Sequence, residues 1–338
     1  MDLHIFWFVA LGILLTGYAV LDGFDLGAGI LHLSVGGENE RRTVLNAIGP
    51  LWDGNEVWLI TFGGALFAAF PHAYATVFSG FYIPFMILLF ALIFRAVSIE
   101  FRSKRESRAW RRTWDAAFFG GSALASFLFG VVVGNMLIGL PVGPDKEFTA
   151  DLFQLLGVFP LLSGALVVAL FALHGSAYLA MKTEGPLHER IRALQTRWYV
   201  VFAILLLAVT VFAWIAVPNA IRNFAVSPWG WVAVAFLAAA VVFYPFAVRR
   251  GKSAHAFLAS ACTVLALTFL FCFSMYPNLV PSTISPDYHI TIRNAASSER
   301  TLSIMRWFAL IGMPLVIVYS IVIHRVFRGK VKIDGGGY

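Results

Sequence analysis

Apolar stretches of about 20 residues recur along this chain, and they limit the folds open to it more than any other feature. Each is long enough for a helix to cross a hydrocarbon core of about 30 Å, whereas the strands of a membrane barrel alternate in hydropathy over about 10 residues. The composition agrees, because 59% of the residues are hydrophobic and only 13% are charged. The sequence therefore predicts an all-α integral membrane protein.

Hydropathy and turn residues together predict nine transmembrane helices. Their expected ranges are 4–31, 44–70, 74–98, 116–139, 153–180, 198–218, 229–248, 255–276 and 303–327. The segment Leu21-Asp22-Gly23, late in the first helix, resembles Leu173-His174-Gly175, late in the fifth. We therefore expect one membrane domain over 1–338, with a four-helix bundle over 4–139, a second over 153–276 and a peripheral ninth helix. The segment 277–302 contains three prolines and is expected to be a non-helical external connection.

Basic residues gather in alternate connections between the predicted helices. The segments 41–42, 102–112, 182–197 and 249–252 and the tail from Arg325 to Lys332 hold most of the Lys and Arg. By the positive-inside rule these segments are cytoplasmic, so the N-terminus is predicted outside and the C-terminus inside. The same distribution accounts for the net charge of +7 without a nucleic-acid partner.

Two pairs of acids interrupt the first two predicted helices. Asp22 and Asp25 are three positions apart and share a helix face, and Asp53 and Glu56 have the same spacing on the second helix. Asp25 and Asp53 are equally far from a turn centred near Asn39, as are Asp22 and Glu56. A symmetric helical hairpin would therefore hold four carboxyl groups at two matched depths inside the membrane.

Such acids oppose insertion into the bilayer by about 2.5–3.5 kcal/mol each when ionised. Neighbouring carboxylates favour protonation of one another, which is the condition that a proton relay needs. The alternative is that protonated acids, together with Asn46 and Asn55, form hydrogen-bonded packing between helices. Both interpretations remain open from the residues alone.

The end of the third predicted helix carries a further set of charges. Arg95, Glu100 and Lys104 lie in the stretch RAVSIEFRSK, and Asp115 opens the fourth predicted helix. Glu100 and Lys104 have the favourable i, i+4 order. The spacing alone favours a solvated, ion-paired helix end, and the functional alternative is a proton entrance at the cytoplasmic face.

Histidines and cysteines show no pattern of haem or metal ligation. Only His174 falls clearly inside a predicted helix, so no facing pair of imidazoles is expected at membrane depth, and His174 is interpreted as a hydrogen-bonded packing residue. Cys262 and Cys272 lie on one predicted helix about 15 Å apart, too far for a disulfide. The sequence also lacks HExxH, CxxC and Walker motifs. We expect no metal site in this chain.

Several segments resemble subunit II of the cytochrome bd-type quinol oxidases. They are GYAVLDGFDLGAGIL, RRTVLNAIGPLWDGNEVWLITFGGALFAAFPHAYATVFSGFY and FRAVSIEFRSK, with looser matches at NMLIGLP, YLAMKTEGPLHER and YPNLVPSTI. The resemblance implies nine helices in two bundles plus one, in a bacterial inner membrane. It also implies membership of a respiratory complex that oxidises quinol, reduces O2 to water and takes protons from the cytoplasm.

The same resemblance implies partners, cofactors and site residues. Haem b, haem d and the quinol-oxidising loop would belong to subunit I, so this chain would ligate no cofactor and would not be catalytic alone. A small single-helix accessory subunit and a structural quinone occur in some members. The implied proton-route residues are Asp22, Asp25, Asp53, Glu56, Glu100, Lys104 and Asp115, and the interface or quinone-proximal candidates are Trp52, Asn55, Trp58 and Arg95.

Two positions depart from the familiar pattern of this family. Glu56 stands where familiar members have Gln, and Glu100 stands where they have Asp. An added acid at Glu56 would extend the relay or replace another of its members. Two other functions would bury the same acids: a proton-coupled secondary transporter, which needs no obligate partner, and a purely structural scaffold subunit.

Overall fold

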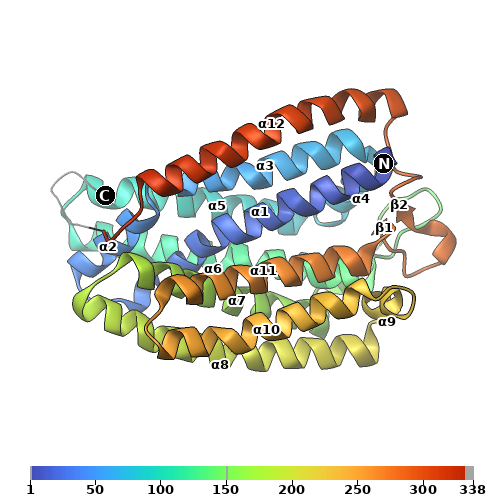
Figure 1. Ribbon diagram of the computed structural model, residues 1–338. Helices are drawn as coiled ribbons and strands as arrows, with labels where there is room; N and C mark the ends of the chain where they lie inside the picture. Colours follow the sequence, from blue (N-terminus) through green and yellow to red (C-terminus); the bar gives the residue numbers. More distant parts are fainter. Residues whose placement is uncertain (1, 150, 332–338) are drawn as a thin grey trace.

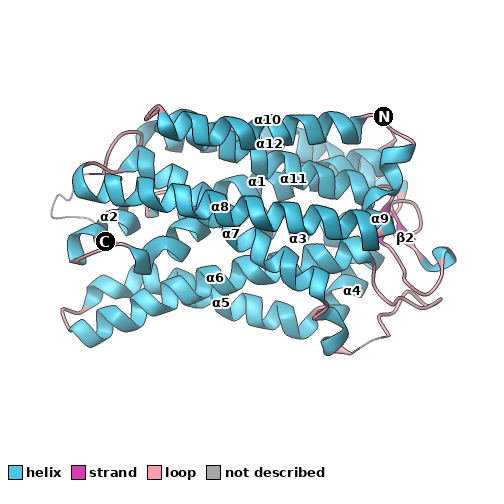
Figure 2. Ribbon diagram, turned by 90° about the horizontal axis from the view of Figure 1, so that it is seen from below, coloured by secondary structure: helices cyan, strands magenta, loops and turns pink. Residues whose placement is uncertain are grey.

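The computed structural model describes residues 2–149 and 151–331, which form a bundle of long helices lying side by side (Figures 1 and 2). The long helices are α1 (Leu3–Leu31), α3 (Trp52–Ala69), α5 (Tyr82–Phe101), α6 (Arg108–Ile138), α7 (Val158–Lys182), α8 (Gly185–Ala216), α10 (Trp229–Arg249), α11 (Ser253–Met275) and α12 (Glu299–Val326). The short helices are α2 (Glu38–Ile48), α4 (Pro71–Gly80) and α9 (Pro218–Ile221).

Shorter elements connect these helices. Single 3₁₀ turns occur at His32–Ser34, Arg102–Lys104, Leu152–Leu155, Arg222–Ala225 and Pro286–Tyr288. The connection between α11 and α12 holds two antiparallel strands, β1 (Asn278–Val280) and β2 (Ile290–Thr291), so the predicted non-helical segment is largely irregular as expected.

Eight helices in the described part of the chain are long and apolar enough to cross a membrane. The helix that is missing from the nine predicted crossings is α3, which has only 18 residues and carries Asp53, Asn55 and Glu56 in its first turns. These polar residues lower the mean hydropathy of α3 below that of the most apolar stretches of the eight helices. The all-α membrane fold is confirmed, and the count of nine stays a prediction.

The second predicted helix, 44–70, is wrong as a continuous element. α2 ends at Ile48, and α3 begins only at Trp52. Pro50 lies between them and has no backbone N–H to continue the helical ladder. The Leu51 N–H instead donates to the carbonyl of Ile48, which closes a tight turn. The break separates α2 from α3 and allows the two helices to point in different directions.

The third predicted helix, 74–98, is also divided. α4 ends at Gly80 and α5 begins at Tyr82, with Pro84 in the first turn of the new helix. Three other helices begin well before their predicted starts, because their first turns are polar and the prediction followed apolar residues: α6, α8 and α12. Lys332, counted above with the basic tail, lies outside the described residues.

α1 and α7 cross in the centre of the molecule at almost direct backbone contact. A Cβ added to Gly27 would lie 1.9 Å from the carbonyl oxygen of Phe171, and one added to Gly175 would lie 2.5 Å from the carbonyl carbon of Gly27. Only glycine fits at such a crossing. Each of these two helices also contacts α6 and α11. The division into two four-helix bundles remains a prediction.

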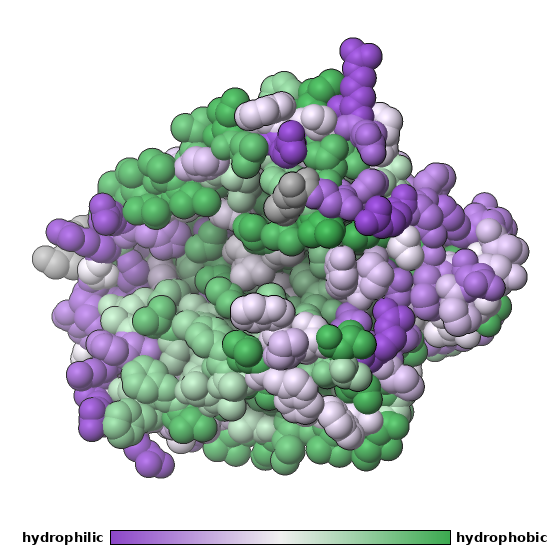
Figure 3. Space-filling view, turned by 45° about the vertical axis from the view of Figure 1, so that its right-hand side comes forward, coloured by the Kyte–Doolittle hydropathy of each residue, from purple (hydrophilic) through white to green (hydrophobic). Residues whose placement is uncertain are grey.

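Apolar side chains cover the middle of the molecule, and hydrophilic ones gather at its two ends (Figure 3). One end carries α2, the connections between α5 and α6 and between α7 and α8, and the end of α12. Because the Arg- and Lys-rich segments lie there, we call it the basic end. It is the end that the sequence predicts to be cytoplasmic.

Candidate functional site

A buried arginine joins three helices in the half of the bundle nearer the basic end. Arg95 of α5 is fully buried, and its Nη2 donates to Asp22 Oδ1 of α1 at 2.7 Å. Its Nη1 donates to Glu56 Oε1 of α3. Each carboxylate therefore has a charged hydrogen-bond donor, an arrangement roughly twice as strong as a neutral hydrogen bond. Asp22 is also fully buried, whereas the Glu56 side chain is 25% exposed.

Asp25 lies one turn further along α1 and has a different partner. Asn55 of α3 donates its amide to Asp25 Oδ2 at 2.7 Å and also reaches the Leu21 carbonyl at 3.3 Å. We call Asp22, Asp25, Asn55, Glu56 and Arg95 the Arg95 cluster. Its second carboxylate oxygens, Asp22 Oδ2 and Asp25 Oδ1, are buried and have no hydrogen-bond partner within the described residues.

The charges of this cluster do not balance. It holds three carboxyl groups against one guanidinium, and a buried carboxylate without a counter-charge is strongly disfavoured. A proton on Asp25 removes a charge that faces only the neutral Asn55. The arrangement can thus bind and release a proton while Arg95 keeps the remaining carboxylates in place.

Asp53 lies outside this cluster. Its side chain is exposed on the surface of the chain, whereas the predicted hairpin keeps all four carboxyl groups inside the membrane. The buried face of α3 is formed instead by Asn55 and Trp58, which are three residues apart. The break at Pro50 also removes the continuous hairpin on which the matched depths depended. Three of the four predicted carboxyl groups meet.

The tryptophans of α3 differ in their surroundings. Trp58 is buried inside the chain against α1, where a Cβ added to Gly17 would overlap its indole ring at 2.2 Å. Trp52 is half-buried. As Asn55 and Arg95 are also buried within the chain, three of the four interface candidates face its interior.

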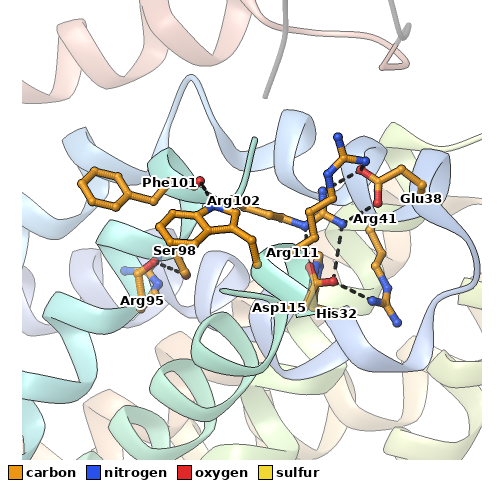
Figure 4. A network of polar contacts seen from close by, with 10 residues as sticks. His32, Glu38, Arg41, Arg95, Ser98, Phe101, Arg102, Arg111 and Asp115 are labelled. Atoms are coloured by element: carbon orange, nitrogen blue, oxygen red, sulfur yellow. Dashed lines mark hydrogen bonds and ion pairs between the residues drawn. The ribbon is translucent and has the colours of Figure 1, made fainter. Parts of the chain in front are cut away.

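A second group of charges lies at the basic end, around Asp115 of α6 (Figure 4). Asp115 Oδ1 is 2.6 Å from His32 Nε2 and accepts from Arg102 Nε, while Oδ2 accepts from Arg41 Nη1 at 2.6 Å. Arg102 also donates from both terminal nitrogens to Glu38, each at 2.9 Å. We call these five residues the Asp115 cluster. It joins α2 to the ends of α1 and α5 and to the start of α6.

The Asp115 cluster is a tight ion-pair network. Asp115 and Arg102 are almost fully buried, and both oxygens of Asp115 accept from charged groups. The hydrogen bonds from Arg102 hold the pKa of Glu38 below its ordinary value. These contacts fit the interpretation of this region as an ion-paired helix end.

Sequence reasoning found only part of this network. Of the predicted series Glu100, Lys104 and Asp115, only Asp115 belongs to it, Lys104 is exposed and Glu100 is half-buried near the end of α5. His32, Glu38, Arg41 and Arg102 were missed as site residues, and the two arginines were counted only as topology charges.

Both ring nitrogens of His174 are engaged in hydrogen bonds, so neither is free to ligate haem iron. Its Nδ1 is 2.7 Å from Ser260 Oγ and its Nε2 is 2.9 Å from the Val20 carbonyl, which confirms it as a hydrogen-bonded packing residue. The described residues contain no group of three or more His, Cys, Asp and Glu side chains arranged for a metal ion.

Comparison with known proteins assigns the chain to a family. The family model for cytochrome bd terminal oxidase subunit II matches residues 3–327. This chain belongs to that family. The cytochrome bd-I ubiquinol oxidase subunit 2 of Escherichia coli (strain K12) is 35% identical, over 94% of this chain and 92% of that protein. The cytochrome bd ubiquinol oxidase subunit 2 of Bacillus subtilis (strain 168) is 34% identical, over 98% and 97%.

The fold of this bd oxidase subunit II has a solved counterpart. A chain of the bd oxidase from Geobacillus thermodenitrificans matches it with a TM-score of 0.80 at 18% identity, covering 97% of this chain and 99% of that one. The protein is accordingly part of a quinol oxidase, an oxidoreductase of the respiratory chain, and crosses the bacterial inner membrane several times. Membership implies a subunit I as partner, in a complex that carries haem.

Proposed function

We propose that this bd oxidase subunit II delivers protons toward subunit I through the Arg95 cluster and supports the haem-bearing subunit I at the surface of α3. The observation that carries the proposal is the meeting of Asp22 and Glu56 on one buried guanidinium, with Asp25 held by Asn55 one helical turn away. Intramembrane acids that face a bundle interior are the usual components of proton relays. Oxygen reduction to water consumes protons, so such a relay suits the family's reaction.

Each member of the Arg95 cluster has a distinct part in this delivery. Asp25 is the site that gains and loses a proton, because its partner Asn55 is neutral. Arg95 is the fixed positive charge that keeps Asp22 in the membrane interior. Glu56 is the member that reaches the surface of the chain, with a quarter of its side chain exposed. A proton would therefore pass from Asp25 and Asp22 toward Glu56.

The surface of α3 beside Glu56 is the proposed docking face for subunit I. Gly63 and Gly64 are open there, since nothing in the described chain lies within 4 Å of a Cβ added to either one. Small residues on an outer helix face let a partner helix approach closely in a membrane. Exposed Asp53 lies at the start of the same helix. This face would bring a subunit I helix close to the acids.

Asp25→Asn is the variant that tests proton delivery in the purified two-subunit complex. The substitution keeps a hydrogen bond to Asn55 and leaves no charge unpaired, so haem content and the amount of co-purified subunit I should stay normal. Quinol-driven O2 consumption and proton uptake should fall by a factor of about 100. Glu106→Gln, an exposed acid in the loop before α6, is the matched control.

Two results would contradict this proposal. Normal turnover with normal proton uptake in Asp25→Asn would remove the cluster from the proton route. Loss of haem in proportion to the loss of activity would instead make the cluster hydrogen-bonded packing, as in the scaffold interpretation.

A further inference from the structure

His324, in the last turn of α12, carries a ring nitrogen that the fold leaves unused. Its Nδ1 is 2.8 Å from the carbonyl oxygen of Ser320, one helical turn earlier. Because a carbonyl oxygen only accepts hydrogen bonds, Nδ1 must carry the hydrogen, and Nε2 is left with a free lone pair. This Nε2 is buried and has no hydrogen-bond partner within 2–149 and 151–331. A buried base of this kind calls for an explanation.

The seam between α3 and α12 contains a small pocket beside this histidine. Its volume is about 10 Å³, close to the space that a single water molecule requires. The lining residues are Pro50, Leu51, Gly54, Asn55, Tyr319, Ser320, Ile323 and His324. The break at Pro50 creates one wall of it. At Gly54, an added Cβ would lie 3.6 Å from the ring of Tyr319, in ordinary van der Waals contact, so the two helices are close neighbours here.

The pocket ends at the Arg95 cluster. Asn55 lines it and also donates its side-chain amide to Asp25 Oδ2 at 2.7 Å, so one residue borders the pocket and holds the proposed proton carrier. On the other side, the ring of Phe24 meets the His324 imidazole edge-on, with centroids 6.2 Å apart. Phe24 is fully buried and closes the direct path between His324 and α7. The polar opening from His324 therefore faces Asn55.

We propose that His324 is a proton-transfer residue that loads protons at the basic end and passes them through a water molecule in this pocket to Asp25. The inference rests on the proposed proton delivery through the Arg95 cluster. Nε2 takes one proton that reaches it from the basic end, and the ring becomes an imidazolium. It then gives a proton to the pocket water as that water gives one to the Asp25 carboxylate. No other reactant is consumed.

His324 suits this task better than the acids predicted as the entrance. Asp115 is held by His32, Arg41 and Arg102, so its oxygens are occupied, and Lys104 is exposed away from any pocket described here. An imidazole changes charge near neutral pH without a large perturbation. His324 is half-buried and lies in the last turn of α12, at the basic end.

Several ionisable groups lie on the elements that surround this imidazole. They are Asp25 of α1, Asp53 and Glu56 of α3, Tyr178 and Lys182 of α7, and Tyr319 and Arg325 of α12. Lys182 donates to the Phe327 carbonyl just beyond the helix end, so its positive charge stays close to this region.

The variant His324→Gln tests the proposal in the purified two-subunit complex. Glutamine places an amide near the position of Nε2 but cannot carry an additional proton. We expect normal haem content and an unchanged thermal midpoint. Quinol-driven turnover and proton uptake should fall roughly tenfold at about pH 8 and less at about pH 6, where protons are more abundant. His255→Gln, at an exposed position in the first turn of α11, is the matched control.

A second variant separates proton transfer from packing. His324→Ala should lose activity in the same way and regain much of it when free imidazole is added. The inference is overturned if His324→Gln keeps wild-type turnover and its pH profile. It is also overturned if both variants lose activity equally at every pH and imidazole restores none. If Asp25→Asn stops proton uptake while His324→Gln does not, only this inference fails; if neither variant matters, the proposed function fails as well.

Discussion

Replacement of Arg95 by methionine should destabilise the protein through the carboxylates it leaves behind. Methionine fills a comparable apolar volume, so the main loss is the counter-charge of Asp22 and Glu56. Asp22 is fully buried and must then become protonated. For a carboxyl of ordinary pKa about 3.9, protonation at pH 7 costs about 4 kcal/mol, which limits the penalty at this residue. Breaking a buried pair typically costs about 3–5 kcal/mol, in agreement with this limit.

Glu56 adds less to the loss of stability, because a quarter of its side chain is exposed at the surface of the chain. Since the cost at Asp22 is one of protonation, it should decrease by about 1.4 kcal/mol for each unit by which the pH is lowered. The double variant Arg95→Met/Asp22→Asn removes the buried acid as well. It should recover most of the lost stability.

The assay is the thermal midpoint and the haem retention of the purified complex at about pH 6, pH 7 and pH 8. Arg95→Lys is the control that keeps the charge but offers no fork to hold both acids, so its loss should be intermediate. A midpoint that is unchanged in Arg95→Met would refute the reasoning. So would a decrease that is the same at every pH and is not relieved by Asp22→Asn, because the lost energy would then be packing rather than charge.

Three further predictions follow from other parts of the molecule. Gly27→Val should prevent accumulation of the folded chain in membranes, measured by immunoblot, because its Cβ would lie 1.9 Å from the Phe171 carbonyl oxygen; normal accumulation would mean that the α1–α7 crossing can separate. Arg102 lowers the pKa of Glu38, so this acid stabilises the fold above its unfolded pKa, and the contribution disappears as the pH falls through the lower folded pKa. Glu38→Gln should therefore lower the midpoint at neutral pH and have no effect in strong acid, and an equal effect in both would contradict the assignment. Gly64→Leu should reduce co-purification of subunit I and leave this chain abundant in membranes, whereas a normal yield of the complex would place the docking face elsewhere.

Hydropathy alone was sufficient to predict the all-α membrane fold and most of its helices. α1, α10 and α11 begin and end within two residues of their predicted limits, because an apolar run of this length has no stable alternative to a helix in a bilayer. Helix starts such as that of α8 were missed, because polar turns that extend beyond the apolar core leave no mark in hydropathy. The breaks at Pro50 and Phe81 were missed because each follows from one or two residues within a long apolar segment.

The carboxyl groups of the site were recognised from the sequence, but their partners were not. Acids inside an apolar helix are conspicuous, and Asp22, Asp25 and Glu56 do meet. Asp53 is also an acid and lies only three residues before Glu56, yet it is exposed, because the break before α3 sets which side of that helix faces α1.

By itself, the sequence determined that this chain is helical, lies in a membrane and carries acids within its apolar segments, because hydropathy and the cost of burying charge in lipid are properties of composition. Only the tertiary structure decided that Arg95 joins Asp22 to Glu56, that Arg102 joins Glu38 to Asp115, and that His324 faces a pocket ending at Asn55. These pairs come from different helices, and the rotation of each helix about its axis depends on how all of them pack together.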